Sequence, residues 1–456
     1  MLNPEIHSLK HIEERIINHS VESLILVLNT GALITPEAEA MIQALYSRSP
    51  APVKVHLQTV AEKGPEKFMS TYYVGYGHQS IGDNGNTTVF IENVSMLAAK
   101  AFQDWALYSG QECSTRYIDF SQQGLMNPAG LPAGAQIQEN WRTFYLHAFP
   151  ILTTDLKIRF PKTVEEKDSI YEKAIKARAF DILRGFLPTG AVTSLAWHMN
   201  LRQAADQLKQ LRHHPLEEVR AVANAVDTSL KTAFPGSFNF NQHEATENYN
   251  AAGAENYLYH DPTINDLTIA FDGIDRGILK TFADHLSTRP IKTELPRRLG
   301  LAGTLRFSFA IDFGSYRDIQ RHRAVIQSMP LLTDEIGFES WYLDELTAEL
   351  RTTALNLLVN QKNAIDQLSL SSAVKQYYLP MGYKISHQVS GTLPALIYLI
   401  EIRATRFVHQ TLAVRAYKMG EMLRELFAHH GLTIHLDSEV LKFDSRRGQH
   451  DIIKTT

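Results

Sequence analysis

The sequence predicts an α+β protein made of two tandem repeats, and three observations support this fold class. The chain has 456 residues, 44% of them hydrophobic and 21% charged, which is typical of a globular protein too long for one ordinary core. Most of it has helical periodicity, and the strand-like runs are few and short. Several features also recur in the same order in both halves. We therefore expect a first repeat at 1–240, a linker at 241–262 and a second repeat at 263–456.

The local patterns place helices, strands and the boundary between the repeats. Apolar spacing predicts helix from Leu201 to Phe234, with a break at Pro215. Strands are expected at Ser23–Leu28, Thr87–Glu92 and Leu305–Ile311. The segment Ser237–Asp261 is rich in Asn, Gly and Ala and has no sustained apolar period, so the domain boundary is placed there.

Four anchors define the repeat. They pair Phe90 with Phe307, Asp104 with Arg321, Leu187-Pro188 with Leu379-Pro380, and Arg212 with Arg403. The first two pairs share a separation of 217 residues. Each half therefore follows the order strand, helix, motif loop, helical stretch, Leu-Pro, helix and arginine.

Composition excludes several classes of protein. The single cysteine, Cys113, excludes intrachain disulfides and cysteine-rich zinc sites. A net charge of −4 argues against bulk nucleic acid as a partner. No apolar run is long enough to span a membrane and the N-terminus is unlike a signal peptide, so we expect a soluble cytoplasmic protein. The adjacent histidine pairs His213-His214 and His429-His430 lack carboxylates at ligand spacing, so no metal site is expected.

The tripeptide Arg321-His322-Arg323, hereafter the RHR segment, is the most informative motif. If it is helical, successive side chains point about 100° apart, so Arg321 and Arg323 face different sides and suit more than one anionic ligand. A solvated basic helix end is the alternative interpretation.

A second motif lies in the first half, in the loop at residues 111–117 (QECSTRY). Ser114 and Thr115 can donate to a phosphate, Arg116 can bind it through two parallel hydrogen bonds, and Glu112 can accept from a ribose hydroxyl. Upstream, His78 lies in a glycine-bounded turn, where a purely structural hydrogen bond is the alternative role.

These motifs together resemble the flavin-dependent thymidylate synthases, whose signature is Arg-His-Arg, seven residues and then Ser, after a Gly-His turn and a strand. The second half has the RHR segment but Leu331 at the serine position, whereas the first half has Ser114 but Asp104-Trp105-Ala106 in place of Arg-His-Arg. The resemblance covers roughly residues 70–215 and 295–415. Each half keeps the part of the signature that the other has lost.

The resemblance implies a fold with a small mixed sheet packed by helices, and a tetramer with sites between subunits. It implies FAD as cofactor, with NADPH and methylenetetrahydrofolate as co-substrates in the conversion of dUMP to dTMP. Because one chain carries two repeats, we expect a homodimer that forms a pseudo-tetramer. Each composite site would join the second-half RHR segment to a first-half 111–117 loop.

The resemblance also assigns roles to individual residues. The catalytic arginine directed at the uracil ring is Arg403 in the second half or Arg212 in the first, and Arg184 is a further nucleotide contact. The flavin contacts are the RHR segment together with His78, Glu112, Asn200 and Arg202. The substrate contacts are Glu112, Ser114, Thr115, Arg116, Arg184, Arg321 and Arg403.

Two other functions stay open at the level of sequence. One is a non-catalytic protein that binds a nucleotide or a flavin, and the other is a flavoenzyme that acts on another pyrimidine nucleotide. Flavin that copurifies with the chain would distinguish an empty scaffold from a flavoprotein, and formation of dTMP would distinguish the two enzymes.

Overall fold

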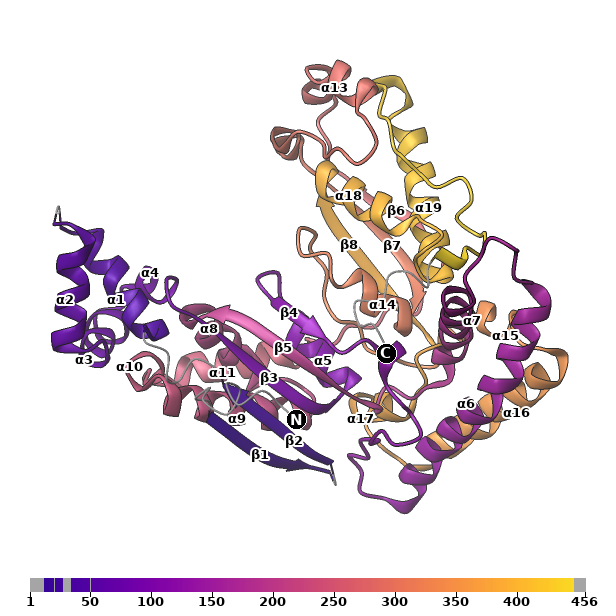
Figure 1. Ribbon diagram of the computed structural model, residues 1–456, viewed down its shortest axis with the longest axis horizontal. Helices are drawn as coiled ribbons and strands as arrows, with labels where there is room; N and C mark the ends of the chain where they lie inside the picture. The colour runs from indigo at the N-terminus through magenta and orange to yellow at the C-terminus, as the bar shows by residue number, and fades with distance from the viewer. Residues whose placement is uncertain (1–11, 20, 28–33, 50, 447–456) are drawn as a thin grey trace. The chain divides into compact units, whose positions relative to one another are not determined.

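The computed structural model describes residues 12–19, 21–27, 34–49 and 51–446, and the chain divides into two compact units (Figure 1). Unit 1 is made of Met1–Ile118, Gln123–Gly130 and Gly190–Leu258, and unit 2 of Asp119–Gln122, Leu131–Thr189 and Tyr259–Thr456. The units differ from the sequence repeats because residues 131–189 pack within unit 2. The repeat boundaries concern correspondence in sequence and stay a prediction.

Unit 1 is built on a five-stranded antiparallel sheet with the order β1-β2-β3-β5-β4. Its strands are β1 (Ile12–Asn18), β2 (Val21–Val27), β3 (Asn86–Ser95), β4 (Ser109–Glu112) and β5 (Val192–Asn200). Alternate residues of β3 are buried, among them Val89 and Ile91. The predicted strands are confirmed as β2 and β3, with Leu28 outside the described residues.

The helices of unit 1 are α1 (Pro36–Tyr46), α2 (Val53–Lys63), α3 (Glu66–Phe68), a π-helix (Met69–Gly75), α4 (Gln79–Gly82), α5 (Met96–Gln103), a 3₁₀ turn (Thr115–Tyr117), α8 (Leu201–Leu211), α9 (Glu217–Ala233), α10 (Pro235–Phe238) and α11 (Glu244–Ala254). Helix α9 contacts β1 and β2, α5 contacts β3 and β5, and α8 contacts β5, whereas α1, α2, α3 and α4 contact mainly other helices. The predicted break at Pro215 is confirmed between α8 and α9. Helix α11 lies in the predicted linker and has no buried residue.

Unit 2 has a three-stranded antiparallel sheet, β6-β7-β8, formed by β6 (Thr268–Asp272), β7 (Thr304–Asp312) and β8 (Lys384–Thr392). Its helices are α6 (Pro132–Arg159), α7 (Asp168–Leu183), α12 (Arg276–Lys280), α13 (Ala283–Thr288), α14 (Phe313–Ile319), α15 (Ser340–Asp344), α16 (Ala348–Gln367), α17 (Ser372–Lys375), α18 (Leu393–Arg403) and α19 (Gln410–Leu426), with 3₁₀ turns at Arg184–Phe186, Arg297–Ala302, Gln376–Tyr378 and Ala428–His430. Strand β7 confirms the third predicted strand.

The α+β class is confirmed, since small sheets and helices make up both units. Every pairing between the named strands is antiparallel, whereas the family resemblance implied a mixed sheet. Neighbouring parallel strands need a crossover connection, which is usually a helix. Helices α5, α8, α14 and α18 directly follow strands but do not connect two neighbouring parallel strands.

The two halves contain matching elements of matching length. Strand β5 and helix α8 have 9 and 11 residues, as do β8 and α18, which begin 192 residues later. Helices α5 and α14 begin 217 residues apart, the separation predicted from the sequence, and the side chains of Ser95 and Asp312 cap them. In the 192-residue register Arg403 corresponds to Leu211, one position before the Arg212 with which the sequence had paired it.

The two Leu-Pro elements lie against each other within unit 2. Pro188 and Pro380 form an antiparallel bridge. The Thr189 amide donates to the Leu379 carbonyl and the Met381 amide donates to the Leu187 carbonyl, both at 2.9 Å. Because 189 and 381 are equivalent, as are 187 and 379, these contacts follow a local two-fold relation.

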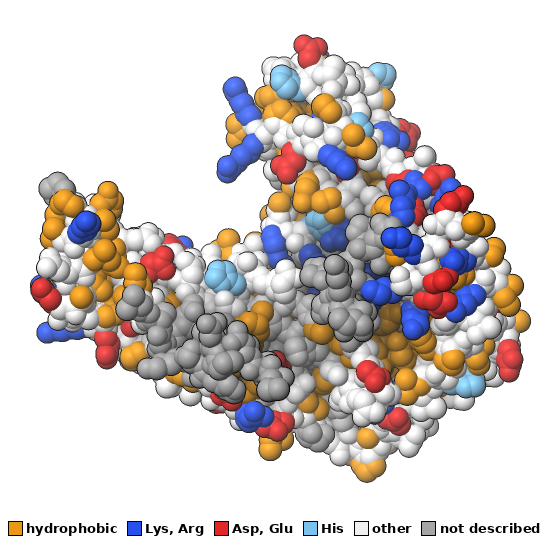
Figure 2. Space-filling view, in the orientation of Figure 1, with side chains coloured by type: hydrophobic (Ala, Val, Ile, Leu, Met, Phe, Trp, Pro, Cys, Tyr) orange, Lys and Arg blue, Asp and Glu red, His pale blue; other side chains and the backbone are white. Residues whose placement is uncertain are grey.

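The visible surface carries both signs of charge. Figure 2 shows acidic and basic side chains intermixed near α7, so this part of the visible face is not a continuous basic surface of the kind that long nucleic acids need. Within the described part of the chain, no helix is long and apolar enough to cross a bilayer.

Candidate functional site

The RHR segment lies in a turn directly after α14, not on a helix as the sequence analysis assumed. Helix α14 ends at Ile319, and residues 320–324 form turns. The Gln327 side-chain amide donates to the carbonyls of Ile319, Gln320 and His322 at 3.2, 3.3 and 3.0 Å. In a continued helix these carbonyls would accept from backbone amides four residues later. Here Gln327 replaces those partners, together with the His322 amide at the Ile319 carbonyl and the Arg323 guanidinium at the Gln320 carbonyl.

Guanidinium groups surround the carboxylate of Asp318. An Nη1 atom of Arg184 lies 3.6 Å from Asp318, and an Nη2 atom of Arg321 lies 3.8 Å from it. Arg403 donates to the Asp318 backbone carbonyl at 2.9 Å. Burial opposes ionisation of Asp318, but the charges of Arg184, Arg321, Arg403 and Arg317 outweigh it and hold the pKa of the carboxyl well below its usual range. We call Asp318 and these four arginines the guanidinium cluster.

His322 is a neutral acceptor inside this cluster. Its Nε2 accepts a hydrogen bond of 2.7 Å from Nε of Arg403, so its proton resides on Nδ1. Burial, reinforced by the charge of Arg403, lowers the pKa of His322 to about 3. The ring of Tyr398 lies edge-on to His322, with centroids 6.2 Å apart.

Arg184 comes from the first repeat but lies beside the RHR segment of the second repeat, within unit 2. It is 5% exposed, which contradicts the ordinary expectation for an arginine in a surface helix. Its Nη2 donates to Ser315 at 3.3 Å. Among the described residues, no acceptor lies within hydrogen-bonding distance of its Nε. The structure thus brings together Arg184, Arg321, His322 and Arg403 from the set of predicted site residues.

A buried polar network supports Arg184 and α14. Asp312 accepts from Tyr342 at 2.7 Å and from Thr411 at 2.6 Å, and Thr411 is also 2.6 Å from Ser315. His409 lies 3.3 Å from Ser315 through Nδ1. Sequence reasoning missed these residues, because nothing in their local pattern indicates that β7, α15 and α19 converge.

The 111–117 loop is held in unit 1 against β5, where the Cys113 amide donates to the Ser194 carbonyl at 2.8 Å. Glu112 forms a buried ion pair of 2.6 Å with Lys100 and accepts from Gln103 at 3.0 Å. Thr115 is buried, Ser114 is half-buried and Arg116 is exposed. Lys100 therefore neutralises the carboxylate that was predicted to contact a ribose.

The first-repeat counterpart of Arg321 is Asp104, which follows α5. It accepts a hydrogen bond of 2.8 Å from the Tyr257 hydroxyl, and the Tyr257 ring lies 4.6 Å from that of His214. Burial, together with the charge of Asp104, raises the pKa of Tyr257 well above its usual value. A carboxylate bound to a tyrosine thus stands where the second repeat has an exposed guanidinium.

The predicted flavin contacts of the first half lie near α4 and α8. Asn200 caps α8, where its side-chain oxygen accepts from the Gln203 amide at 2.8 Å. Arg202 pairs with Asp83 at 2.7 Å, directly after α4, and His78 immediately precedes α4. Arg212 pairs instead with Glu247 of α11 at 3.3 Å.

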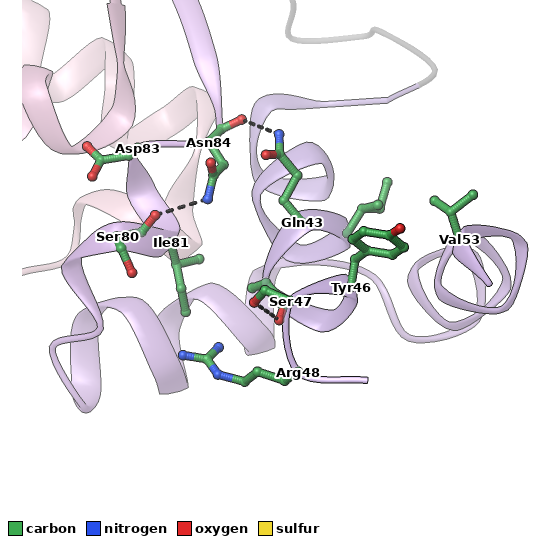
Figure 3. Close-up of a pocket in the computed structure, with 11 residues that line it drawn as sticks. Gln43, Tyr46, Ser47, Arg48, Val53, Ser80, Ile81, Asp83 and Asn84 are labelled. Carbon is green, nitrogen blue, oxygen red and sulfur yellow. Dashed lines mark hydrogen bonds between the residues drawn. The ribbon is translucent and has the colours of Figure 1, made fainter. Parts of the chain in front are cut away.

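A cavity of about 620 Å³ lies beside α4, between it and α1 and α2 (Figure 3). Its polar wall includes Gln43, which donates to the Asn84 carbonyl at 3.4 Å, and Asn84, which donates to the Ser80 carbonyl at 3.0 Å. Tyr46 and Val53 supply apolar surface. His78 is not among its lining residues, so this cavity is separate from the predicted histidine contact.

Fold and site together define an α+β protein with convergent guanidinium groups, an arrangement that suits anionic ligands. Residues 15–236 match the Thy1 family model, described as thymidylate synthase complementing protein. This match confirms the resemblance found in the sequence.

Relatives of similar length occur in bacteria and archaea. A UPF0159 protein of Chlamydia muridarum is 25% identical over 409 residues, which covers 76% of each chain, and one of Chlamydia pneumoniae is 26% identical over 394 residues, or 74% of each. A UPF0159 protein of Thermoplasma acidophilum is 22% identical and covers 78% of this chain and 86% of its own. The solved structure of a UMP/dUMP methylase PolB from Streptomyces cacaoi, bound with 5-Br UMP, has a TM-score of 0.27 at 15% identity and covers 47% of this chain and 92% of that chain.

Proposed function

We propose that this chain is a flavin-dependent thymidylate synthase-like enzyme that methylates dUMP to dTMP, with methylenetetrahydrofolate as carbon donor and NADPH as reductant. The observation that carries the proposal is the guanidinium cluster, in which four arginines converge near a single carboxylate, Asp318. The Thy1 match of residues 15–236 supports the reaction class.

Two arginines of the cluster differ in how they can bind a ligand. Arg184 is buried, and its Nε has no acceptor among the described residues. This N–H group can therefore donate to an anionic oxygen of a ligand. Arg321 is half-exposed, with 50% of its side chain accessible, so it can contact a ligand from solvent. These two features fit a phosphate-bearing nucleotide or the diphosphate of FAD.

Arg403 is the candidate for stabilising negative charge on the uracil ring. In the described part of the chain it donates through Nε and Nη2, which leaves Nη1 for a ligand. His322 fixes the guanidinium by accepting from Nε, and a fixed donor stabilises a developing oxyanion without reorganising. FAD, when bound, supplies the hydride-transfer chemistry that these side chains cannot.

We also propose that the chain arose by tandem duplication and forms a homodimer. The equal lengths of the matching elements and the reciprocal hydrogen bonds of the Leu-Pro elements support the duplication. In each composite site the guanidinium cluster of unit 2 would bind the ligand together with Ser114, Thr115 and Arg116 of a 111–117 loop. Light scattering that finds a stable flavin-bound monomer would exclude the dimer.

The decisive experiment identifies the ligands that copurify with the chain and then assays it with dUMP, methylenetetrahydrofolate and NADPH. Bound FAD with formation of dTMP supports the proposal. Bound FAD without dTMP favours a flavoenzyme on another pyrimidine nucleotide. A nucleotide bound without any turnover favours the non-catalytic alternative.

A further inference from the structure

The RHR turn is held by a side chain that the sequence did not single out. The Nε2 atom of Gln327 lies within 3.3 Å of three carbonyl oxygens, those of residues 319, 320 and 322. An amide nitrogen has two hydrogens, so these three acceptors share them. One side chain therefore fixes the backbone on both sides of Arg321.

The orientation of this amide is itself determined by a chain of donors. The hydroxyl of Tyr259 lies 3.4 Å from Nδ1 of His387, and Nε2 of His387 lies 3.2 Å from Oε1 of Gln327. Because Gln327 must donate through Nε2, its oxygen must accept, so His387 carries its proton on Nε2 and accepts from Tyr259. His387 is fully buried. Every donor in this chain thus points toward the RHR turn.

We call the Gln327 side chain, with its three carbonyl acceptors, the clamp. The corresponding position of the first repeat has no such side chain. The bridge of Ile326 with Ser390 corresponds to the pair of Ser109 with His198, in the registers of 217 and 192 residues. Position 327 therefore corresponds to Gly110, which has no side chain and a φ of +152°. A Cβ there would lie 1.9 Å from the Ala196 carbonyl oxygen, so no glutamine fits. Only the repeat that keeps the RHR segment has the clamp.

We propose that Gln327, oriented by His387, is a positioning residue that holds the RHR turn in the conformation that binds an anionic ligand. The inference rests on the proposed function, because it assigns the ligand to the guanidinium cluster. Gln327 acts through Arg321 and through His322, the acceptor that fixes Arg403. It does not itself contact the ligand.

The test uses Gln327→Glu in the full chain and calorimetric titration with dUMP. The carboxylate has no hydrogens at neutral pH and faces three carbonyl oxygens, so we expect dUMP affinity to fall roughly 10- to 100-fold at pH 8. The matched control is Gln361→Glu, since Gln361 is a buried glutamine of unit 2 that donates to the Ile137 carbonyl on α6. It should lower stability while leaving dUMP affinity unchanged.

The pH profile separates positioning from simple structural damage. A carboxylate that faces three carbonyl oxygens is disfavoured, so the introduced carboxyl gains a proton more readily than a free glutamic acid as pH falls from 8 to 5. It can then donate one hydrogen bond, so the affinity of Gln327→Glu relative to wild type should recover in part. In the wild-type chain His322 and His387 remain neutral over this range, because burial lowers the pKa of each to about 3. Equal affinities of Gln327→Glu and wild type at pH 8, or a deficit that does not change with pH, would overturn the clamp. No binding of dUMP by the wild-type chain would overturn the proposed function and the clamp together.

Discussion

Replacing Arg184 by methionine tests whether the guanidinium cluster is both a structural element and a ligand site. At 3.6 Å from Asp318 and an effective dielectric constant of about 20, the Coulomb attraction is about 5 kcal/mol. Desolvation of the two groups cancels much of it, and Asp318 keeps other arginines nearby. The hydrogen bond to Ser315 adds about 1 kcal/mol. We therefore expect the free energy of unfolding to fall by about 2 kcal/mol.

The same variant should bind dUMP at least about 10-fold more weakly, because a charge-assisted contact is lost. Urea denaturation at pH 7 measures the first effect and calorimetry the second. The control is Arg289→Met, which removes another buried arginine of unit 2, paired with Glu401, and should lower stability without changing dUMP affinity. Wild-type affinity in Arg184→Met, or equal losses of affinity in both variants, would refute the reasoning.

Three further predictions follow from the two repeats and the cluster. Titration should find one FAD per chain, with retention abolished by Arg321→Ala and nearly unchanged by Asp104→Ala; two FAD per chain would contradict this. Arg116→Ala should weaken dUMP binding by roughly 1.5 to 3 kcal/mol in calorimetry, since a bidentate contact is lost, and an unchanged affinity would remove the 111–117 loop from the site. Because the pKa of Asp318 is lowered on folding, its contribution to stability is present above about pH 4, the unfolded value, and is lost as pH falls further. Urea midpoints of Asp318→Asn should therefore decline less in acid than those of wild type, and parallel declines would contradict the lowered pKa.

The sequence analysis predicted β2, β3 and β7 and did not predict β1, β4, β5, β6 and β8. In β3 and β7 apolar residues give the period directly. In β8 the buried residues include Ser386 and His387, whose partners come from distant segments, so the pattern resembles a loop. Local sequence contains no information on those partners.

The same limit applies to the site. Arg321 and Arg403 were identified because a known signature marks their spacing. Gln327 was missed, since its role depends on three backbone carbonyls that are available to a side chain only because the helix ends before it. The helical geometry assumed for the RHR segment was wrong for the same reason.

The contact between Asp104 and Tyr257 has a consequence for attempts to rebuild the lost half of the signature. Replacing Asp104 alone by arginine would leave the hydroxyl of half-buried Tyr257, a donor, facing a second donor. The ring of His214 would still pack edge-on against Tyr257. Under the proposed duplication, the surroundings of Asp104 therefore oppose a change to the arginine found at the corresponding position of the second half. Restoring a second binding site would require several simultaneous substitutions, beginning with Tyr257.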